Sequence, residues 1–246
     1  MAPGKRKNRW HRPGLRWWLT DYLRQTRSLG NSLLFITPLL VVYNVGLVLT
    51  GPRVMNGADF VSGHLFDLLG ARNYMLLQPV LLLAAVIVVL MLRRRGSLNL
   101  RHFPLLLVEC GVYASLMGTL ILLAMHEVNL LLLGSVTPPG GGLTDVFVIS
   151  AGAGFYEELV FRLLLLGSLW RVLAVFMHPV VAGVAAVALT SVLFSLAHYL
   201  GPEEFAWFSF WYRSFAGVIF ATLFMLRGFA VAVYTHALYN IFVFLR

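Results

Sequence analysis

Long apolar runs, separated by short polar segments, constrain this chain more than any other feature of its sequence. The chain of 246 residues is 59% hydrophobic and 12% charged, whereas a soluble domain carries about 25% charged residues. A transmembrane helix needs about 20 apolar residues. Runs of this kind lie at 31–50, 73–92, 103–125, 145–170, 179–200, 207–226 and 229–245. They predict an all-α fold, a polytopic membrane helical bundle of about seven transmembrane helices.

The basic residues predict how this bundle is oriented. A net charge of +9 would favour nucleic acid in a soluble protein, but here Lys and Arg gather beside the apolar runs. Because cytoplasmic loops are enriched in Lys and Arg, we expect a cytoplasmic N-terminus. With seven spans, only Arg53, Arg72 and Arg246 fall outside. We therefore expect a multi-pass protein of a bacterial inner (plasma) membrane, with the lipid bilayer and not nucleic acid as its partner.

The chain divides into three parts by composition. Residues 1–28 form a basic juxtamembrane segment in which Leu15, Trp18 and Tyr22 recur at helical spacing, which predicts an amphipathic helix on the membrane surface. Residues 29–142 hold N-terminal transmembrane helices of unassigned role. Residues 143–246 hold four predicted spans and every motif discussed below.

The segment "GAGFYEELVFRLLLLG" places three ionisable side chains within a predicted span, where charge is costly and usually functional. Glu158 and Arg162 are four residues apart and share a helix face, so they are expected to pair and to have a structural role. Glu157 points about 100° away from Glu158 on an α-helix. It is therefore expected to face a cavity.

Two further spans carry polar groups. The segment "LFSLAHYL" places His198 one turn after Phe194, and "YTHALYN" places His236 and Asn240 four residues apart on one face. Taken singly, each is explained by packing or by a hydrogen bond between helices. Together they supply a carboxylate, two imidazoles and a carboxamide. Such a set can deprotonate water and donate hydrogen bonds to an oxyanion, which is enough to hydrolyse an amide.

These segments resemble the motifs of the CPBP family, which comprises CAAX proteases and bacteriocin-processing enzymes. "EELVFR" is similar to the family's EExxxR motif, "FSLAH" to FxxxH and "HALYN" to HxxxN, over roughly residues 143–245. The resemblance implies an intramembrane endopeptidase of the type II CAAX prenyl endopeptidase kind, cutting near the C-terminus of membrane-associated substrates. It implies that Glu157 is the general base and that His198 positions the water. His236 and Asn240 would form the oxyanion site, and Glu158, Arg162 and Phe194 would support the site structurally.

The resemblance leaves the question of a metal open, because family members have been described both as metalloproteases and as metal-free glutamate proteases. Glu157, His198 and His236 could supply the three protein ligands of a zinc site. We expect no cofactor, since Glu157 is available as the base and Asn240 fits an oxyanion role. The segment "HEVNL" is not a zinc motif, because Leu130 stands where the second histidine is required.

Two other expectations follow. The alternative to a protease is a non-catalytic protein of the same family that acts in bacteriocin immunity or as a scaffold. Separately, Glu109 could pair with a polar group or line the cavity. The predicted site lies toward the segments "TPPGGG" and "GPEE", which the seven-span topology places outside. Substrates are therefore expected to be membrane-embedded or lipid-anchored proteins, such as exported proteins with C-terminal sorting tails.

Overall fold

Helices make up all the regular structure in the described part of the chain. The computed structural model describes residues 15–51, 100–127, 142–200 and 203–245, with scattered positions between 58 and 91. Within these residues there is no strand. The all-α prediction is confirmed.

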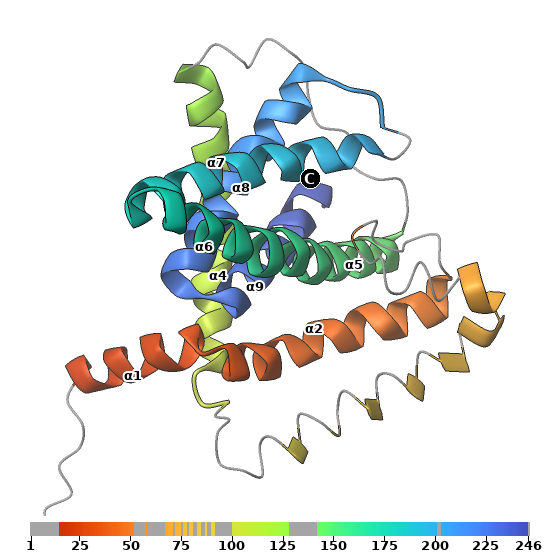
Figure 1. Ribbon diagram of the computed structural model, residues 1–246. Helices are drawn as coiled ribbons and strands as arrows, with labels where there is room; N and C mark the ends of the chain where they lie inside the picture. Colours follow the sequence, from red (N-terminus) through yellow and green to blue (C-terminus); the bar gives the residue numbers. More distant parts are fainter. Residues whose placement is uncertain are drawn as a thin grey trace, which may run out of the picture.

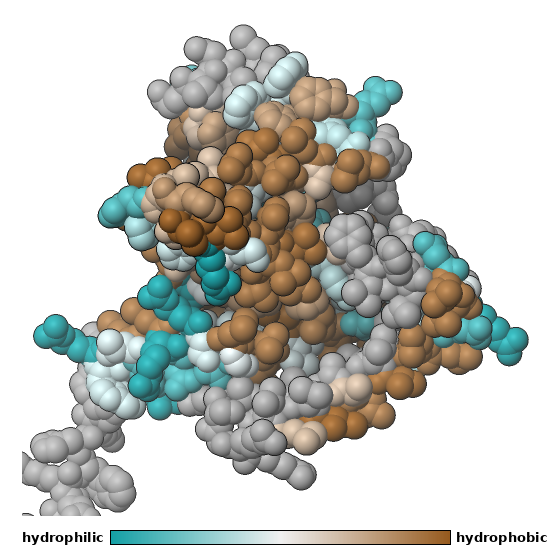
Figure 2. All heavy atoms as spheres, viewed as in Figure 1, coloured by the Kyte–Doolittle hydropathy of each residue, from teal (hydrophilic) through white to brown (hydrophobic). Residues whose placement is uncertain are grey.

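Two helices placed nearly end to end form the N-terminal part (Figure 1). Helix α1 (Leu15–Arg27) is followed at Ser28, whose backbone is extended, by α2 (Leu29–Thr50). The two run nearly end to end along the lower edge of the molecule in Figure 1. Hydrophilic side chains gather over α1, while apolar side chains cover much of the rest of the face shown in Figure 2. This arrangement fits the predicted amphipathic surface helix.

One long helical rod crosses the middle of the molecule (Figure 1). It consists of α5 (Leu143–Gly152), η3 (Ala153–Leu166) and α6 (Gly167–Phe176). The sequence predicted an α-helix over 145–170, but η3 is π-helical. Because a π-helix closes its hydrogen bonds over five residues, consecutive side chains diverge less than on an α-helix. Glu157 and Glu158 are both buried, with 9% and 0% of their surface exposed.

Helices α4 (Phe103–Glu127) and α9 (Phe229–Phe244) pack together, and α9 also packs against η3. A Cβ atom on Gly154 would lie 2.8 Å from Cβ of Ala237 and 2.8 Å from the carbonyl oxygen of Val233. Only glycine therefore permits this approach of η3 to α9. The close approach brings the glutamates of η3 beside the polar face of α9.

The last pair of helices completes the bundle. Helix α7 (Pro179–Ala197) continues into the short 3₁₀ turn η4 (His198–Leu200), and α7 packs against α8 (Trp207–Arg227). A Cβ atom on Gly217 would lie 2.9 Å from Cβ of Ser191, so this glycine also permits a close helix contact.

Five described helical segments are long and apolar enough to cross a membrane: Leu29–Thr50, Phe103–His126, Leu143–Phe176, Pro179–Leu200 and Trp207–Arg227. The apolar helix Phe229–Phe244 is shorter. The predicted span at 73–92 falls largely outside the described residues. The count of seven spans, and the orientation that depends on it, stay predictions.

A partly buried ion pair joins α4 to the end of α8 and accounts for Glu109. Arg227 donates from Nε to Oε1 of Glu109 (2.6 Å) and from Nη2 to Oε2 (2.7 Å). The hydroxyls of Tyr22 and Tyr113 also donate to this carboxylate. Of the two roles that the sequence left open, Glu109 therefore has the first, pairing with a polar group.

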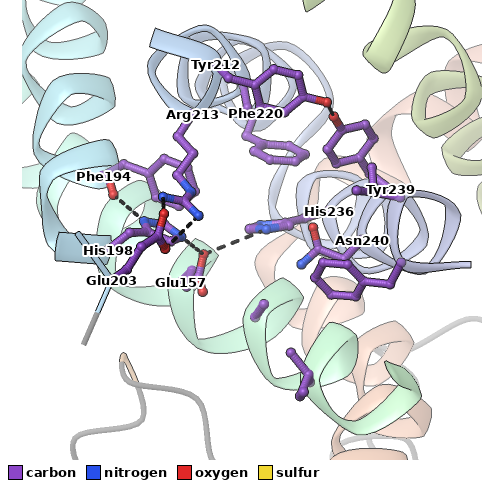
Figure 3. Close-up of a pocket in the computed structure, with 15 residues that line it drawn as sticks. Glu157, Phe194, His198, Glu203, Tyr212, Arg213, Phe220, His236, Tyr239 and Asn240 are labelled. Atoms are coloured by element: carbon purple, nitrogen blue, oxygen red, sulfur yellow. Dashed lines mark hydrogen bonds and ion pairs between the residues drawn. The ribbon is translucent and has the colours of Figure 1, made fainter. Parts of the chain in front are cut away.

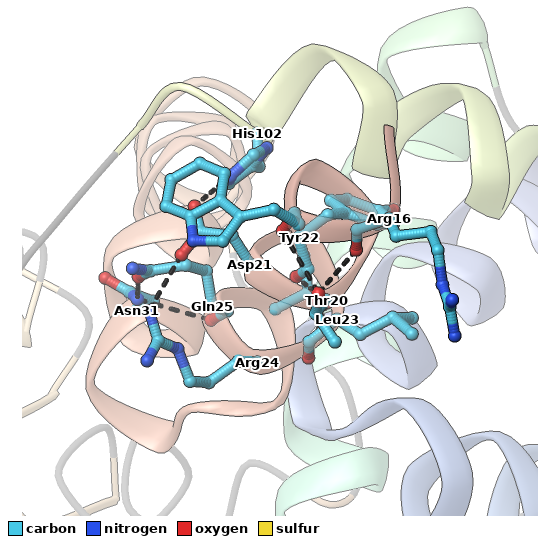
Figure 4. A network of polar contacts seen from close by, with 11 residues as sticks. Arg16, Thr20, Asp21, Tyr22, Leu23, Arg24, Gln25, Asn31 and His102 are labelled. Carbon is cyan, nitrogen blue, oxygen red and sulfur yellow. Dashed lines mark hydrogen bonds and ion pairs between the residues drawn. The ribbon is translucent and has the colours of Figure 1, made fainter. Parts of the chain in front are cut away.

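A second polar network holds α1 against the start of α4 (Figure 4). The Asp21 carboxylate lies 3.0 Å from Nε2 of His102 and accepts a hydrogen bond from Arg24 at 2.9 Å. The hydrogen bonds from His102 and Arg24 hold the pKa of Asp21 at about 2, below its usual 3.8. Helix α1 is thus attached to the bundle by polar as well as apolar contacts.

Candidate active site

A cavity of about 370 Å³ lies where η3, η4, α8 and α9 meet. Its lining includes all four residues predicted to be catalytic, Glu157, His198, His236 and Asn240. It also includes Phe194, which was predicted to support them. Figure 3 shows these side chains converging from three separate parts of the chain. The structure therefore brings the predicted set together.

Glu157 stands between the two imidazoles. Its Oε2 atom lies 3.9 Å from Nε2 of His198 and 3.7 Å from Nε2 of His236. Both separations exceed the donor–acceptor distance of a direct N–H···O hydrogen bond, which is about 2.7–3.2 Å. The three groups face one another across a gap small enough for one water molecule to contact the carboxylate and an imidazole together.

His198 is fixed by the end of α7. Its Nδ1 lies 2.8 Å from the carbonyl oxygen of Phe194. Because a carbonyl can only accept, Nδ1 donates to it, and Nε2 of the same ring faces Glu157. The Phe194 ring packs edge-on against His198, with 5.0 Å between ring centroids. The orientation of His198 therefore follows from its position at the turn between α7 and η4.

His236 is held on three sides. Its Nδ1 lies 2.8 Å from Oε1 of Glu158, its ring stacks on Phe220 at 4.2 Å between centroids, and its Nε2 faces Glu157. The ion pair predicted between Glu158 and Arg162 is present, with Oε1 3.2 Å from Nη1. Glu158 thus touches His236 as well as Arg162, a contact that reasoning along a single helix could not find.

Arg162 is enclosed by aromatic rings. Its guanidinium carbon lies 4.2 Å from the centroid of Phe194 and 5.4 Å from that of Phe220, and only 2% of the side chain is exposed. It also donates from Nη2 to the carbonyl oxygen of Gly217 at 3.4 Å. Arg162 therefore links η3 to α8 beneath the cavity.

Asn240 lines the cavity one turn after His236 on α9, as their spacing predicted. In Figure 3 it lies beside His236, across the cavity from His198. A carboxamide and an imidazole thus line the same side of the cavity, opposite His198.

Sequence reasoning did not assign Glu203 and Arg213 to the site, although both line the cavity. Arg213 donates from Nη1 to Oε1 of Glu203 at 2.6 Å and from Nη2 to Oε2 at 2.9 Å. Partial burial alone would raise the pKa of Glu203, but these hydrogen bonds lower it below its usual value. An arginine within a predicted span was the sequence signal that could have pointed to this pair.

Two tyrosines complete the wall of the cavity. The hydroxyls of Tyr212, on α8, and Tyr239, on α9, are hydrogen-bonded to each other. Their contact joins the two helices beside Phe220.

The three residues weighed as zinc ligands, Glu157, His198 and His236, all line the cavity. Among residues that the structure describes, no group of three or more His, Cys, Asp and Glu side chains is arranged to hold a metal ion. A carboxylate between two imidazoles can take a proton from water directly. Whether a metal takes part is a question for the experiments below.

Comparison with known proteins agrees with this chemistry. No curated protein and no solved structure matches the chain. Residues 139–242 match the family model described as Type II CAAX prenyl endopeptidase Rce1-like, and these residues include every side chain of the site described above. The chain therefore carries, at residues 139–242, a domain that belongs to the CAAX protease (CPBP) family of membrane-embedded proteases.

Proposed function

We propose that the chain is an intramembrane endopeptidase that hydrolyses a peptide bond near the C-terminus of membrane-associated proteins, with water activated by Glu157 and His198. The observation that supports this most is the position of the Glu157 carboxylate, 3.7–3.9 Å from two imidazoles in a cavity that Asn240 also lines.

In the proposed reaction, Glu157 takes a proton from a water molecule that His198 orients through Nε2. The oxygen of that water attacks the peptide carbonyl and forms a tetrahedral oxyanion. Glu157 then passes the proton to the peptide nitrogen as the C–N bond breaks. The second proton of the water stays on the attacking oxygen, so the products are a new carboxylic acid, which then ionises in water, and a free amine, and Glu157 is returned to its starting state.

His236 and Asn240 stabilise the oxyanion in this mechanism. The Nδ1 proton of His236 is held by Glu158 at 2.8 Å. Donation to the oxyanion requires a proton on Nε2 of His236 as well, and Nε2 is the ring nitrogen that faces Glu157. The Asn240 carboxamide supplies a second donor. Removing one such donor from a preorganised site typically lowers kcat by about 10²- to 10³-fold.

The test compares the C-termini of membrane proteins in cells that make the wild-type chain, Glu157→Gln or His198→Ala. Both variants are expected to leave substrates uncut. Glu204→Gln changes an exposed loop carboxylate and serves as the matched control. If Glu157→Gln and His198→Ala accumulate normally and leave C-termini and phenotype unchanged, the non-catalytic alternative, immunity or a scaffold, is the better account.

We propose that no metal is required. The purified chain is expected to keep its activity in a chelator and to hold no stoichiometric zinc. Loss of activity in the chelator, restored by Zn²⁺ alone, would instead assign Glu157, His198 and His236 as zinc ligands.

A further inference from the structure

An apolar groove lies on the surface of the α7–α8 pair, outside the catalytic cavity. It has a volume of about 540 Å³, and its lining includes Val184 and Val218, which are 67% and 39% exposed. The two polar side chains of its lining donate to backbone carbonyl oxygens. The Thr222 hydroxyl donates to Val218 at 2.8 Å, and the Trp170 indole donates to Pro179 at 3.0 Å. This α7–α8 groove therefore presents an apolar surface to a ligand.

The length of the α7–α8 groove fits one leaflet of a membrane. The groove follows α7 from Pro179 to Ala188, which is about 14 Å at 1.5 Å per residue. The hydrocarbon core of a bilayer is about 30 Å thick, so each leaflet contributes about 15 Å. Gly183 forms part of the floor, where a Cβ atom would lie 3.5 Å from Nε1 of Trp170 and 3.7 Å from Cε of Met225. The groove therefore matches the depth that an acyl chain occupies in one leaflet.

A second apolar hollow adjoins this groove and is called the α6 hollow. It has a volume of about 350 Å³, lies against η3 and α6, and shares Trp170 and Pro179 with the α7–α8 groove. Leu163 and Phe224 supply apolar walls, and Arg171 also lines it. A lipid with two acyl chains on one head group can therefore place one chain on each side of the contact between Trp170 and Pro179.

Two exposed arginines lie where these hollows meet the end of α8. Arg171 lines the α6 hollow, and Arg27 donates from Nη2 to the carbonyl oxygen of Met225 at 3.3 Å. Among the described residues, neither arginine forms an ion pair with a carboxylate. Arg227, at the same end of α8, differs because it is paired with Glu109. The two hollows thus end beside two positive charges that no described side chain neutralises.

Apolar hollows beside two cations fit an anionic phospholipid. A phosphate accepts strong hydrogen bonds from guanidinium groups, and basic sites between transmembrane helices on the cytoplasmic side bind anionic head groups. The distribution of Lys and Arg predicts that Arg27 and Arg171 face the cytoplasm. Figure 2 shows hydrophilic side chains between helix α1 and the turn that joins α6 to α7. A zwitterionic lipid carries its own cation, so it gains less from the two arginines.

We propose that the α7–α8 groove and the α6 hollow together bind one anionic phospholipid. Its phosphate lies near Arg27 and Arg171, and its two acyl chains lie in the two hollows. This site shares no lining residue with the catalytic cavity. The proposal therefore does not depend on the proposed function.

The experiment uses the purified full-length chain in nanodiscs of phosphatidylcholine. A small share of the lipid is replaced by phosphatidylglycerol or phosphatidylcholine with bromine on the acyl chains, which quenches a nearby indole. The quenching of Trp170 alone is the difference between a protein and its Trp170→Phe variant. Trp170 is 38% exposed, so this change leaves the core intact. Raising the brominated share gives an apparent affinity for each lipid. Phosphatidylglycerol is expected to bind about 10- to 30-fold more tightly, the preference that two arginines give at a membrane surface.

The wild-type comparison alone can overturn the proposal. Equal affinities for the two brominated lipids, measured at Trp170, would do so. Soluble glycerol 3-phosphate, which has the phosphate without the acyl chains, is expected to leave the quenching unchanged. If it displaces the lipid, the ligand is a free phosphate ester and the proposed phospholipid site is wrong.

Arginine variants test the charged end of the site. Arg27→Gln and Arg171→Gln are each expected to weaken the binding of phosphatidylglycerol about fivefold, and the double variant should bind both lipids equally. Arg16→Gln changes an exposed arginine of α1 that lines neither hollow, so it is the matched control and should keep the wild-type preference. A wild-type preference in the double variant would contradict the role of the two arginines.

A filled groove tests the apolar part. Ala188 is exposed and lines the α7–α8 groove, so Ala188→Phe adds a ring in the path of the acyl chain without changing the core. We expect phosphatidylglycerol to bind about tenfold more weakly, the effect of displacing one or two methylene groups. Val181→Phe, at an exposed position of α7 outside both hollows, is the matched control. Wild-type affinity in Ala188→Phe, or an equal loss in Val181→Phe, would contradict the placement of the chain in the groove.

Discussion

At the residue scale, Glu158 has the contacts that distinguish a positioning group from a merely structural ion pair. It lies within 3.2 Å of Arg162 and 2.8 Å of His236. Glu158→Gln keeps the shape of the side chain but removes the negative charge beside Nδ1 of His236. We expect kcat to fall by about 100-fold or more, with a much smaller change in KM, because the interaction contributes mainly in the transition state. Steady-state kinetics of the purified variant measure both constants.

A stability control is needed for Glu158→Gln, because removing one partner of a buried ion pair typically costs about 3–5 kcal/mol. Glu109→Gln breaks the pair with Arg227, away from the cavity. Both variants are expected to lower the unfolding temperature, but at a temperature where each is folded only Glu158→Gln should lower kcat. Equal kcat values in the two variants would show that Glu158 has no role beyond packing.

The sequence identified those site residues that belong to short motifs. Glu157, His198, His236 and Asn240 could be predicted because spacing on each helix, together with the cost of charge in lipid, singles them out. Contacts between elements could not be predicted in this way. Arg213 with Glu203, and Arg227 with Glu109, join residues 10 and 118 positions apart. Such pairs depend on how helices pack, which no local pattern specifies.

At the scale of elements, the contact between η3 and α9 sets the distance between the glutamates and His236. Gly154→Ala would place a methyl group 2.8 Å from both Ala237 and the backbone of Val233. We expect a loss of about 1–3 kcal/mol of stability, as for other overpacked contacts, and a clear loss of activity. A Cβ atom on Gly111 in α4 would have no heavy atom of another residue within 4 Å, so Gly111→Ala is the matched control. Thermal unfolding and peptide cleavage report the two effects, and wild-type behaviour of Gly154→Ala would contradict the account.

Helix α1 offers a test through pH. The pKa of Asp21 is lowered to about 2 by His102 and Arg24. A carboxyl with a lowered pKa stabilises the folded state above its ordinary pKa of 3.8 and loses that contribution as the pH falls toward about 2. Hydrogen exchange of the α1 amides is therefore expected to accelerate from about pH 4 downward, relative to the intrinsic rates. In Asp21→Asn this step should be absent, and the same profile in both proteins would argue against the contact.

The helices themselves were largely predictable, and their irregularities were not. The apolar runs at 31–50, 103–125 and 179–200 match α2, α4 and the start of α7 closely, because lipid-facing segments must satisfy their backbone internally. The π-helical turns of η3 were missed. Hydrophobic periodicity along the chain does not distinguish a π-helix from an α-helix.

At the scale of the whole molecule, orientation decides which proteins can reach the cavity. The distribution of Lys and Arg predicts a cytoplasmic N-terminus, and seven spans then place the C-terminus outside. Alkaline phosphatase fused after Arg246 is therefore expected to be active, and a fluorescent protein that folds only in the cytoplasm is expected to be dark. The reverse result would place the cavity mouth, with its residue Glu203, on the cytoplasmic side. Exported proteins would then cease to be the expected substrates.

The central claim is that Glu157 activates the water that cuts the peptide. The most direct measurement is the rate at which the purified full-length chain, in lipid nanodiscs, cleaves an N-palmitoylated peptide, for the wild type and for Glu157→Gln. Glutamine keeps the size of the side chain but cannot accept the proton. The account predicts a fall in kcat of at least about 10²- to 10⁴-fold, the usual contribution of a general base. Cleavage by a folded Glu157→Gln protein at the wild-type rate would contradict it.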